Sequence, residues 1–486
     1  MMEQSSLSAV TSVQLSPETT PGFTHVDELT TESAEVTSRL LTENHTQFHT
    51  RWKLTFHNHL AHHLLTLWAL GASPSEIQAM WNYNAAYQTG LHDPDVESKH
   101  LDLQNPQAFK QALGKDENYA VFLKFFENEI HDKGLPEVLQ IYLLDGSELA
   151  NDIFYRLWTD LMHPAIHLGC GLEFNQPSII AEALAGACVH QDWARVFLEP
   201  TEKSTAPHSD VSSSLFIQML ESLHNDPLIS SGVKHDDPFN KIPDGLLKRV
   251  SGEAFAPHLS IFQCSEQNGD LRDKMTDMFY GCVYMVSAAQ SPGKHEALDF
   301  VTLHSVTMAG FFPAILALDW MSDHDKARLL VAKARVDGVM YAGCGVPFLY
   351  PGRVTHYIPK HPDQDWSQLL KRAIGYYDEG HAAKFVRAML SLQVLDGPPA
   401  GFPIAKPDLI KVVHMALDSI ERAMEPGGSE MPESAAQAVI NRIGLGGEMV
   451  KNNMVRWVFY NGLEKAWDFV PIKKKKSCNN LLKELV

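Results

Sequence analysis

The chain has 486 residues, enough for a large buried core organised as one big domain or as two to three smaller ones. Hydrophobic residues make up 44% of it and charged residues 20%, which is typical of a globular protein. Because 59 acidic residues outnumber 40 basic ones and give a net charge of −19, the composition excludes a protein that binds nucleic acid over a broad surface.

The chain divides into three parts by its patterning. Residues 1–35 are polar and rich in Ser and Thr, and we expect them to be disordered. Helical spacing of apolar residues dominates 36–470, which predicts a mainly α fold, a large multi-helix single domain with long irregular loops that carries the active site. Residues 471–486 form a basic tail, and a polar loop or linker is expected at 199–214.

Helix signals recur along the central part. Ser73 and Glu76, with Pro74 between them, are typical of a capping box that starts a helix running toward Gly90. The Gly-, Pro- and Tyr-rich stretch 338–358 is the best candidate for a non-helical region. Further helices are expected at 52–70, 179–190, from 322 through 334, and at 376–395 and 407–424.

The most apolar stretch, 300–318, is long enough to span a bilayer. It contains several polar residues and is flanked by acidic ones, so we interpret it as a buried core helix and expect no membrane partner. The six cysteines form no CxxC pair, and the first 20 residues lack the apolar core of a secretory signal. These features predict a reducing, cytoplasmic environment.

Several common catalytic motifs are missing from the sequence. No GxGxxG follows a strand and opens a helix, which argues against an internal flavin or nicotinamide domain. There is also no GxxxxGK[ST], no GxSxG and no HExxH. Phosphate-binding and nucleophile machinery of known types is therefore not expected.

Histidines are abundant, with 24 in the chain, and the densest group lies at 57–63. If this segment is helical, His59 shares a face with either His62 or His63, and a metal could bind there. The alternative is a single hydrogen-bonded core histidine on an otherwise amphipathic helix. His163 precedes Pro164, which biases it toward a non-helical backbone at a helix start, where it is either a metal ligand or a turn residue.

Two further positions lie inside apolar segments. His304 falls in the middle of 300–318 and needs a polar partner, which a metal or another side chain could supply. His381 and Lys384 are one helical turn apart, and Lys384 either extends to the surface or is desolvated and reactive. Jointly these segments predict one metal site drawn from four helices.

The same segments carry a resemblance. NH at 58–59, HPxIHLGxGLEF at 163–174, LHxVT at 303–307 and HAxK at 381–384 resemble the questin oxidase-like family, which includes fungal enzymes of anthraquinone and related polyketide pathways. The resemblance covers residues 40–465. It implies an iron-dependent oxygenase in which four histidines and a carboxylated lysine hold Fe(II). Carried over by motif, the metal ligands would be His59, His163, His304, His381 and Lys384.

Within this resemblance, His63 and His167 are the rivals for the first two ligand positions, and Asp299 and Thr307 are candidates for residues that support the site. The expected reaction is cleavage of the central ring of an anthraquinone-type aromatic polyketide by dioxygen. An NADPH-dependent Baeyer–Villiger oxidation is the alternative among oxidases. A non-catalytic helical binding protein and a zinc hydrolase are further alternatives.

Overall fold

The computed structural model describes residues 10–52, 56–91, 101–204, 215–266, 269–426, 428 and 455–473. This part of the chain is mainly α-helical, as predicted, and its strands are the short pair β1 (Arg51–Trp52) and β2 (Phe56–His57). They run antiparallel with Arg51 opposite His57. Among the residues that the structure describes, none of the helices combines the length and the hydropathy needed to cross a membrane.

The contacts group the chain into two compact units. The first unit comprises Met1–Arg195, Phe311–Lys326 and Ile374–Arg387. Its elements besides the two strands are α2 (Thr31–Gln47), α3 (Leu60–Ala69), α4 (Pro74–Ala85), α5 (Pro106–Ala112), η1 (Asp116–Asn118), α6 (Tyr119–Lys133), α7 (Leu135–Leu139), η2 (Gln140–Leu144), α8 (Glu148–Leu157), η3 (Asp160–Met162), α9 (His163–Glu173), α10 (Pro177–Val189), α18 (Phe312–Leu316) and the first half of α22 (His381–Val394).

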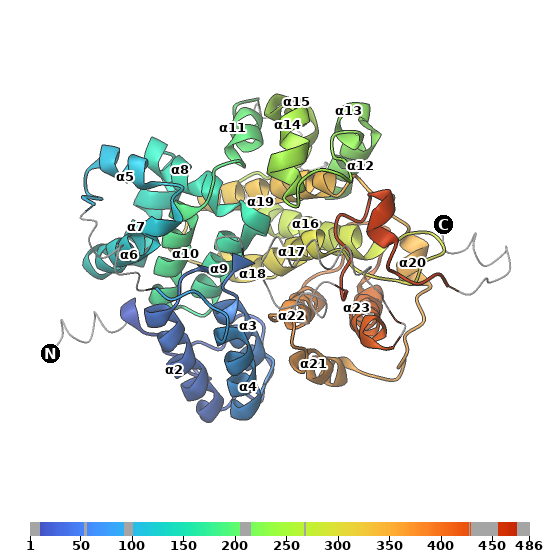
Figure 1. Cartoon of the computed structure of the whole chain (residues 1–486), viewed down its shortest axis with the longest axis horizontal. Helices are drawn as coiled ribbons and strands as arrows, with labels where there is room; N and C mark the ends of the chain where they lie inside the picture. The colour runs from blue at the N-terminus through green and yellow to red at the C-terminus, as the bar shows by residue number, and fades with distance from the viewer. Residues whose placement is uncertain are drawn as a thin grey trace. The chain divides into compact units, whose positions relative to one another are not determined.

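The core of the first unit is built around α10. Every residue of this helix from Ser178 to Val189 is buried, and α10 packs against α6 and α9 (Figure 1). A Cβ at Gly171 of α9 would lie 2.5 Å from the Ile180 side chain, so the absence of a side chain there permits the close approach of α9 and α10. The single charged residue of α10, Glu182, must therefore find partners inside the core.

The second unit comprises Val196–Gly310, Ala327–Ala373 and Ala388–Val486. All residues of α16 from Lys274 to Ala288 and all residues of α17 from Val301 to Ala309 are buried, and the two helices pack against each other. Its elements are α11 (Arg195–Ser204), α12 (Phe216–Asn225), α13 (Pro227–Ser230), η5 (Ile242–Leu246), α14 (Leu247–Arg249), α15 (Gly252–Leu259), α16 (Asp270–Ala288), α17 (Phe300–Ala309), α19 (Asp323–Gly343), α20 (Pro351–Thr355), α21 (Trp366–Ile374), η6 (Lys406–Asp408), α23 (Leu409–Met424) and η7 (Glu464–Trp467).

Several expected elements are confirmed. The Ser73–Glu76 capping box is present at the start of α4, which ends at Ala85 before reaching Gly90. Helix α10 matches the prediction at 179–190, α19 begins at Asp323, and α23 lies within the predicted 407–424. The apolar stretch 300–318 is buried from Val301 to Pro313 and becomes partly exposed after that. It forms two helices because Pro313, near the start of α18, has no N–H to continue the first.

Other expectations were wrong. The predicted helix at 52–70 begins only at Leu60, because the preceding residues alternate in character and pair as the β1–β2 hairpin. The predicted non-helical stretch at 338–358 contains the end of α19 and all of α20. The predicted helix at 376–395 starts at His381, because Glu379 and Gly380 both have left-handed backbone angles.

The segments expected to be irregular are partly described. Residues 10–35 depart from the expected disorder, since Val10 and Val13 are buried and the backbone N–H of Val13 donates to Thr42 Oγ1 at 3.0 Å. Helix α11 extends into the predicted linker as far as Ser204, and residues 205–214 lie outside the described part. Of the five lysines in the basic tail, only Lys473 is described.

Candidate metal centre

Three of the predicted ligands meet in the first unit, and each stands at the N-terminal end of a helix. His59 is the residue before α3, while His163 and His381 are the first residues of α9 and α22. The ring centroid of His59 lies 4.9 Å from that of His163 and 4.9 Å from that of His381. All three are at most 6% exposed. The positive end of a helix dipole opposes protonation of an imidazole, so this placement favours neutral rings that can bind a metal.

Local turns fix these helix starts. The Asn58 side chain accepts the backbone N–H of Leu60 at 3.0 Å and so caps α3. The expectation of a non-helical backbone at His163 was wrong, because His163 is already helical. The non-helical residues lie just before it, where Asp160, Leu161 and Met162 all have positive φ. Strained backbone of this kind is concentrated at functional sites.

The Nδ1 atom of each ring faces an oxygen. His59 Nδ1 lies 2.6 Å from Glu379 Oε2, His163 Nδ1 lies 2.5 Å from the carbonyl oxygen of Asp160, and His381 Nδ1 lies 2.6 Å from the carbonyl oxygen of Asp378. A carbonyl or carboxylate oxygen can only accept, so each Nδ1 carries the proton and each Nε2 presents a lone pair. Histidines that bind metals are held in this tautomer by an acceptor at the other nitrogen.

Two of these lone pairs point at each other. His59 Nε2 and His163 Nε2 are 2.8 Å apart, and two unprotonated nitrogens repel at that distance. Protonation is unfavourable, because burial, followed by the charge of Lys384, lowers the pKa of His59 well below its usual value. A metal ion would remove the conflict, since two nitrogens at right angles, each about 2.1 Å from an ion, are separated by about 3 Å. A neutral Glu379 that donates to His59 would also remove it.

Glu379 is the site residue that the sequence did not reveal. Its Oε1 accepts a hydrogen bond from Tyr87 Oη at 3.1 Å, and potential ligand atoms of His59, Glu379 and His381 all lie within 4.8 Å of one another. Burial raises the pKa of Glu379 to about 7, although Lys384 and Tyr87 oppose this. The only signal in the sequence is an acidic pair, Asp378 and Glu379, directly before the glycine that precedes His381.

A chain of side chains continues from Glu379 to His63. Tyr87 lies 2.9 Å from Asn84 Oδ1, and the Asn84 amide donates to His63 Nδ1 at 2.8 Å. His63 therefore uses Nδ1 as an acceptor, unlike the three histidines above. Burial, with a contribution from Lys384, lowers the pKa of His63 to about 3, so the ring is neutral. These contacts favour His59 over His63 as a ligand.

Lys384 is buried in the same unit, one helical turn after His381, and is 5% exposed. Burial lowers the pKa of its amine to about 8, against the opposing attraction of Glu379 and Asp378. The side chain of Lys384 therefore does not extend to the surface. A buried amine with a lowered pKa has the neutral, nucleophilic form available near neutral pH.

A second group of potential ligands, His57, Asp160 and His190, lies beside the first. The ring of His57 stacks on that of His163 with centroids 3.9 Å apart. His190 Nδ1 lies 2.5 Å from the carbonyl oxygen of Gly186, so its Nε2 accepts from His57 Nε2 at 2.6 Å, and no tautomer conflict arises. Asp160 is also paired with Arg51 at 3.1 Å, and that cation opposes a metal ion. This group is satisfied by its own hydrogen bonds.

His62 and His167 share a different set of buried hydrogen bonds, although the ring centroid of His62 lies 5.7 Å from that of His59. His62 Nε2 lies 3.0 Å from His167 Nδ1, and His167 Nε2 lies 2.7 Å from Glu182 Oε2, so both ring nitrogens of His167 have partners. Glu182 also contacts His45 Nδ1 at 2.7 Å, and Glu127 lies 2.9 Å from His45 Nε2. Glu182, the charged residue of α10, thus has two histidines as partners inside the core. These contacts favour His163 over His167 as a ligand.

The remaining predicted residues lie in the second unit. His304 is 1% exposed, and its Nδ1 lies 2.8 Å from the carbonyl oxygen of Phe300, the same kind of contact that orients His163 and His381. Asp299 caps α17 by accepting the backbone N–H of Thr302 at 2.9 Å, and the hydroxyl of Thr307 donates to the carbonyl of Leu303 at 3.3 Å. Asp299 also accepts the backbone N–H of Asn461 at 3.0 Å and the Cys344 thiol at 3.5 Å, so it ties the start of α17 to other segments of the second unit.

Comparisons with known proteins agree on the kind of protein. A model of the questin oxidase-like family matches residues 56–389, a range that contains all five predicted ligands. The oxidoreductase AflY of Aspergillus parasiticus is 41% identical over 466 residues, covering 94% of this chain and 93% of the relative. The Baeyer–Villiger oxidase ptaJ of Pestalotiopsis fici is 34% identical over 428 residues (85% and 94%). The questin oxidase of Aspergillus fumigatus is 33% identical over 398 residues (79% and 88%).

Proposed function

This chain belongs to the questin oxidase-like family, a family of oxidases, and we propose that it is a non-haem iron dioxygenase that cleaves the central ring of an anthraquinone-type aromatic polyketide. The observation that carries the proposal is the common orientation of three buried histidines, each with Nδ1 at 2.5 or 2.6 Å from an oxygen, which favours the tautomer with the lone pair on Nε2. Such a set suits a divalent transition metal.

In this proposal, His59, His163, His381 and Lys384 hold Fe(II). When bound, the iron would supply the one-electron chemistry that allows dioxygen to react with an aromatic substrate. Imidazoles alone leave the charge of the ion uncompensated, and an anionic ligand is usual in non-haem iron oxygenases. The neutral amine of Lys384 can add carbon dioxide to give a carbamate and release one proton, and the carbamate oxygen is such an anionic ligand.

The residues around the ligands have their own tasks. Glu379, held by Tyr87, keeps the proton on His59 Nδ1 and places a second negative charge close to the ion. The three helix starts disfavour imidazolium, so protons do not compete with the metal for Nε2. Burial of the three histidines, Glu379 and Lys384 excludes water, which strengthens the electrostatic interactions within the centre.

Elemental analysis of protein purified without a metal-affinity tag tests the metal. We expect about one iron per chain in the wild type and loss of iron in Lys384→Ala and His163→Ala, because each removes a ligand. His62→Gln is the matched control, since His62 is buried near the centre but shares its hydrogen bond with His167. Absence of iron in freshly reduced, iron-supplied wild type would refute the proposal.

The lysine modification and the fifth ligand have separate tests. Removal of carbon dioxide during reconstitution should lower the iron content of the wild type, and bicarbonate should restore it, whereas Lys384→Ala should respond to neither. The sequence also predicts His304 as a ligand, and the iron content of His304→Ala decides that assignment. Retention of full iron by Lys384→Ala would remove the lysine from the ligand set.

A second candidate is an NADPH-dependent Baeyer–Villiger oxidation, which the names of several relatives favour. Labelled dioxygen separates the two reactions. A dioxygenase places both oxygen atoms in the product and consumes no NADPH. A Baeyer–Villiger oxidation places one atom in the product, sends the other to water and consumes one NADPH, so the isotope pattern and the NADPH requirement must change together.

A further inference from the structure

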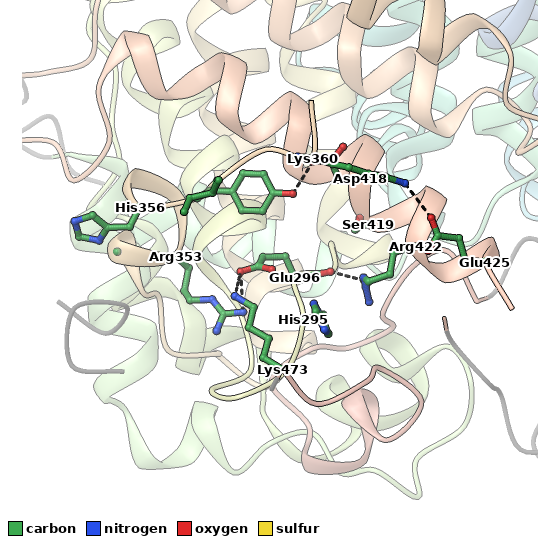
Figure 2. Close-up of a pocket in the computed structure, with 13 residues that line it drawn as sticks. His295, Glu296, Arg353, His356, Lys360, Asp418, Ser419, Arg422, Glu425 and Lys473 are labelled. Carbon is green, nitrogen blue, oxygen red and sulfur yellow. Dashed lines mark hydrogen bonds and ion pairs between the residues drawn. The ribbon is translucent and has the colours of Figure 1, made fainter. Parts of the chain in front are cut away.

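A cavity of about 590 Å³ lies within the second unit, lined by residues of α20, α23, the segment around Glu296 and Lys473 (Figure 2). All its lining residues belong to the second unit, whereas the histidine centre belongs to the first. The volume falls in the range of pockets that hold small organic ligands. No step of the proposed reaction uses this cavity.

The wall of the cavity carries more positive than negative charge. It contains four cations and three carboxylates, in a chain whose net charge is −19. Two of the carboxylates have cationic partners. Asp418 pairs at 2.9 Å with Arg372, which does not line the cavity and also pairs with Glu421, and Glu425 pairs with Lys360 at 2.9 Å. Among the described residues of the wall, Arg353, Arg422 and Lys473 then lie beside the carboxylate of Glu296.

These three cations gather around Glu296, as Figure 2 shows. Arg353 contacts Glu296 Oε1 at 3.2 Å, and Lys473 contacts the same oxygen. Arg422 reaches only the backbone carbonyl oxygen of Glu296, at 2.6 Å. One carboxylate thus contacts two cations, and no carboxylate of the described residues is within hydrogen-bonding distance of the third.

Arg422 also has an unused donor. Its Nη1 is buried and has no acceptor among the residues that the structure describes. A buried guanidinium N–H without an acceptor is unfavourable, so an oxygen of a ligand would be stabilising at this position. The pKa of His295, which lines the same cavity, is lowered by burial and then by Arg422, so the charge of Arg422 acts within this space.

We propose that this cavity binds a small organic molecule through a phosphate group, with Arg353, Arg422 and Lys473 contacting the phosphate oxygens. A phosphate monoester carries nearly two negative charges near neutral pH, which suits a wall with more cations than carboxylates, and guanidinium groups bind phosphate oxygens in pairs. Tyr357 and Ile358, the latter 77% exposed, give the organic part an apolar surface.

Titration calorimetry on the full chain tests the proposal, with inorganic phosphate and a simple phosphate monoester as probes and sodium chloride at matched ionic strength as the blank. We expect saturable binding of one phosphate, weakened at least about tenfold in Arg422→Gln and also weakened in Lys473→Gln. Lys371→Gln is the matched control, because Lys371 is exposed on α21 and does not line the cavity, so its affinity should equal that of the wild type.

Two results would overturn the proposal. One is equal phosphate affinity in the wild type, Arg422→Gln and Lys473→Gln, including no binding in any of them. The other is tighter binding of a monocarboxylate such as acetate than of phosphate. Lys473 is only partly buried, so Lys473→Gln keeps the test valid if Arg422→Gln fails to fold. Iron content is measured in parallel, and it should stay at the wild-type level whatever the phosphate result.

Discussion

Glu379 has two roles in the proposed centre. Its oxygen determines which ring nitrogen of His59 carries the proton, and its negative charge lies close to the proposed ion. The 2.6 Å contact from Oε2 to Nδ1 requires an N–H on Nδ1 whenever the carboxylate is ionised. Burial raises its pKa to about 7, so a nearby cation that keeps the group ionised also keeps His59 in the metal-binding tautomer. Glu379 and a metal therefore stabilise each other's state.

Substitution of Glu379 should separate these effects. Glu379→Met keeps a side chain of similar length but has no acceptor oxygen. We expect it to lose roughly 10- to 100-fold in iron affinity, as is usual when a metal-binding histidine loses its supporting oxygen. Glu379→Gln keeps an oxygen that can face His59 but lacks the charge, and its affinity should lie between those of the wild type and Glu379→Met. Competitive titration with an iron chelator measures all three.

Melting temperatures of the iron-free proteins are the control, because both variants should fold if only metal affinity is affected. Iron affinities equal to that of the wild type in both variants would contradict the assigned role of Glu379. Equal losses in both variants would assign the effect to charge and not to the tautomer.

The histidines and the glutamate differ in how far they could be predicted. His59, His163 and His381 stand in dense or distinctive segments, so the sequence and the resemblance pointed to them as candidate ligands. Glu379 and Tyr87 are separated by 292 positions, and nothing local in the sequence marks their contact. The choice between His59 and His63 also depends on hydrogen-bond direction, which only the folded arrangement provides.

At the scale of elements, the start of α22 depends on Gly380. Its φ is +79°, and a Cβ there would lie 2.6 Å from the ring of His63. The backbone can therefore turn into α22 and pass the His63 ring only without a side chain at this position. His381 follows directly, so any displacement of the turn moves a proposed ligand.

Gly380→Ala should destabilise the protein and weaken iron binding. We expect a loss of about 2–4 kcal/mol in unfolding free energy, combining left-handed strain with the clash against His63. Gly401→Ala is the matched control, because Gly401 has φ +80° and nothing within 4 Å, so it should lose only the strain contribution of about 1–2 kcal/mol and keep its iron. Urea denaturation and elemental analysis measure both variants, and equal losses of stability would contradict the contact with His63.

Elements were predictable where the signal is local. The Ser73–Glu76 capping box and the apolar periodicity of α10 contain their own evidence, and both were confirmed. The β1–β2 hairpin was missed because its strands have two residues each, too short for alternation to outweigh the helical pattern that follows. The left-handed run at Asp160–Met162 was missed because none of these residues is glycine.

At the scale of the whole molecule, burial of ionisable groups makes stability depend on pH. Burial alone would lower the pKa of His45, but hydrogen bonds with Glu127 and then Glu182 raise it to about 9. Two other buried histidines have lowered pKa values instead, because burial lowers the pKa of His63 to about 3 and that of His190 to about 4. Stability from these two histidines is present above their unfolded pKa of 6.5 and is lost as the pH falls through the folded values.

The alkaline side isolates His45. Because its pKa is raised on folding, its contribution is fully present below pH 6.5 and is lost as the pH rises through about 9. A shift of this size corresponds to about 3 kcal/mol. We therefore expect the difference in unfolding free energy between the wild type and His45→Gln to shrink by about 3 kcal/mol between pH 6.5 and pH 9. Urea denaturation of the iron-free proteins across this range measures it, and a difference that does not change with pH would show that His45 is not an imidazolium between the two glutamates.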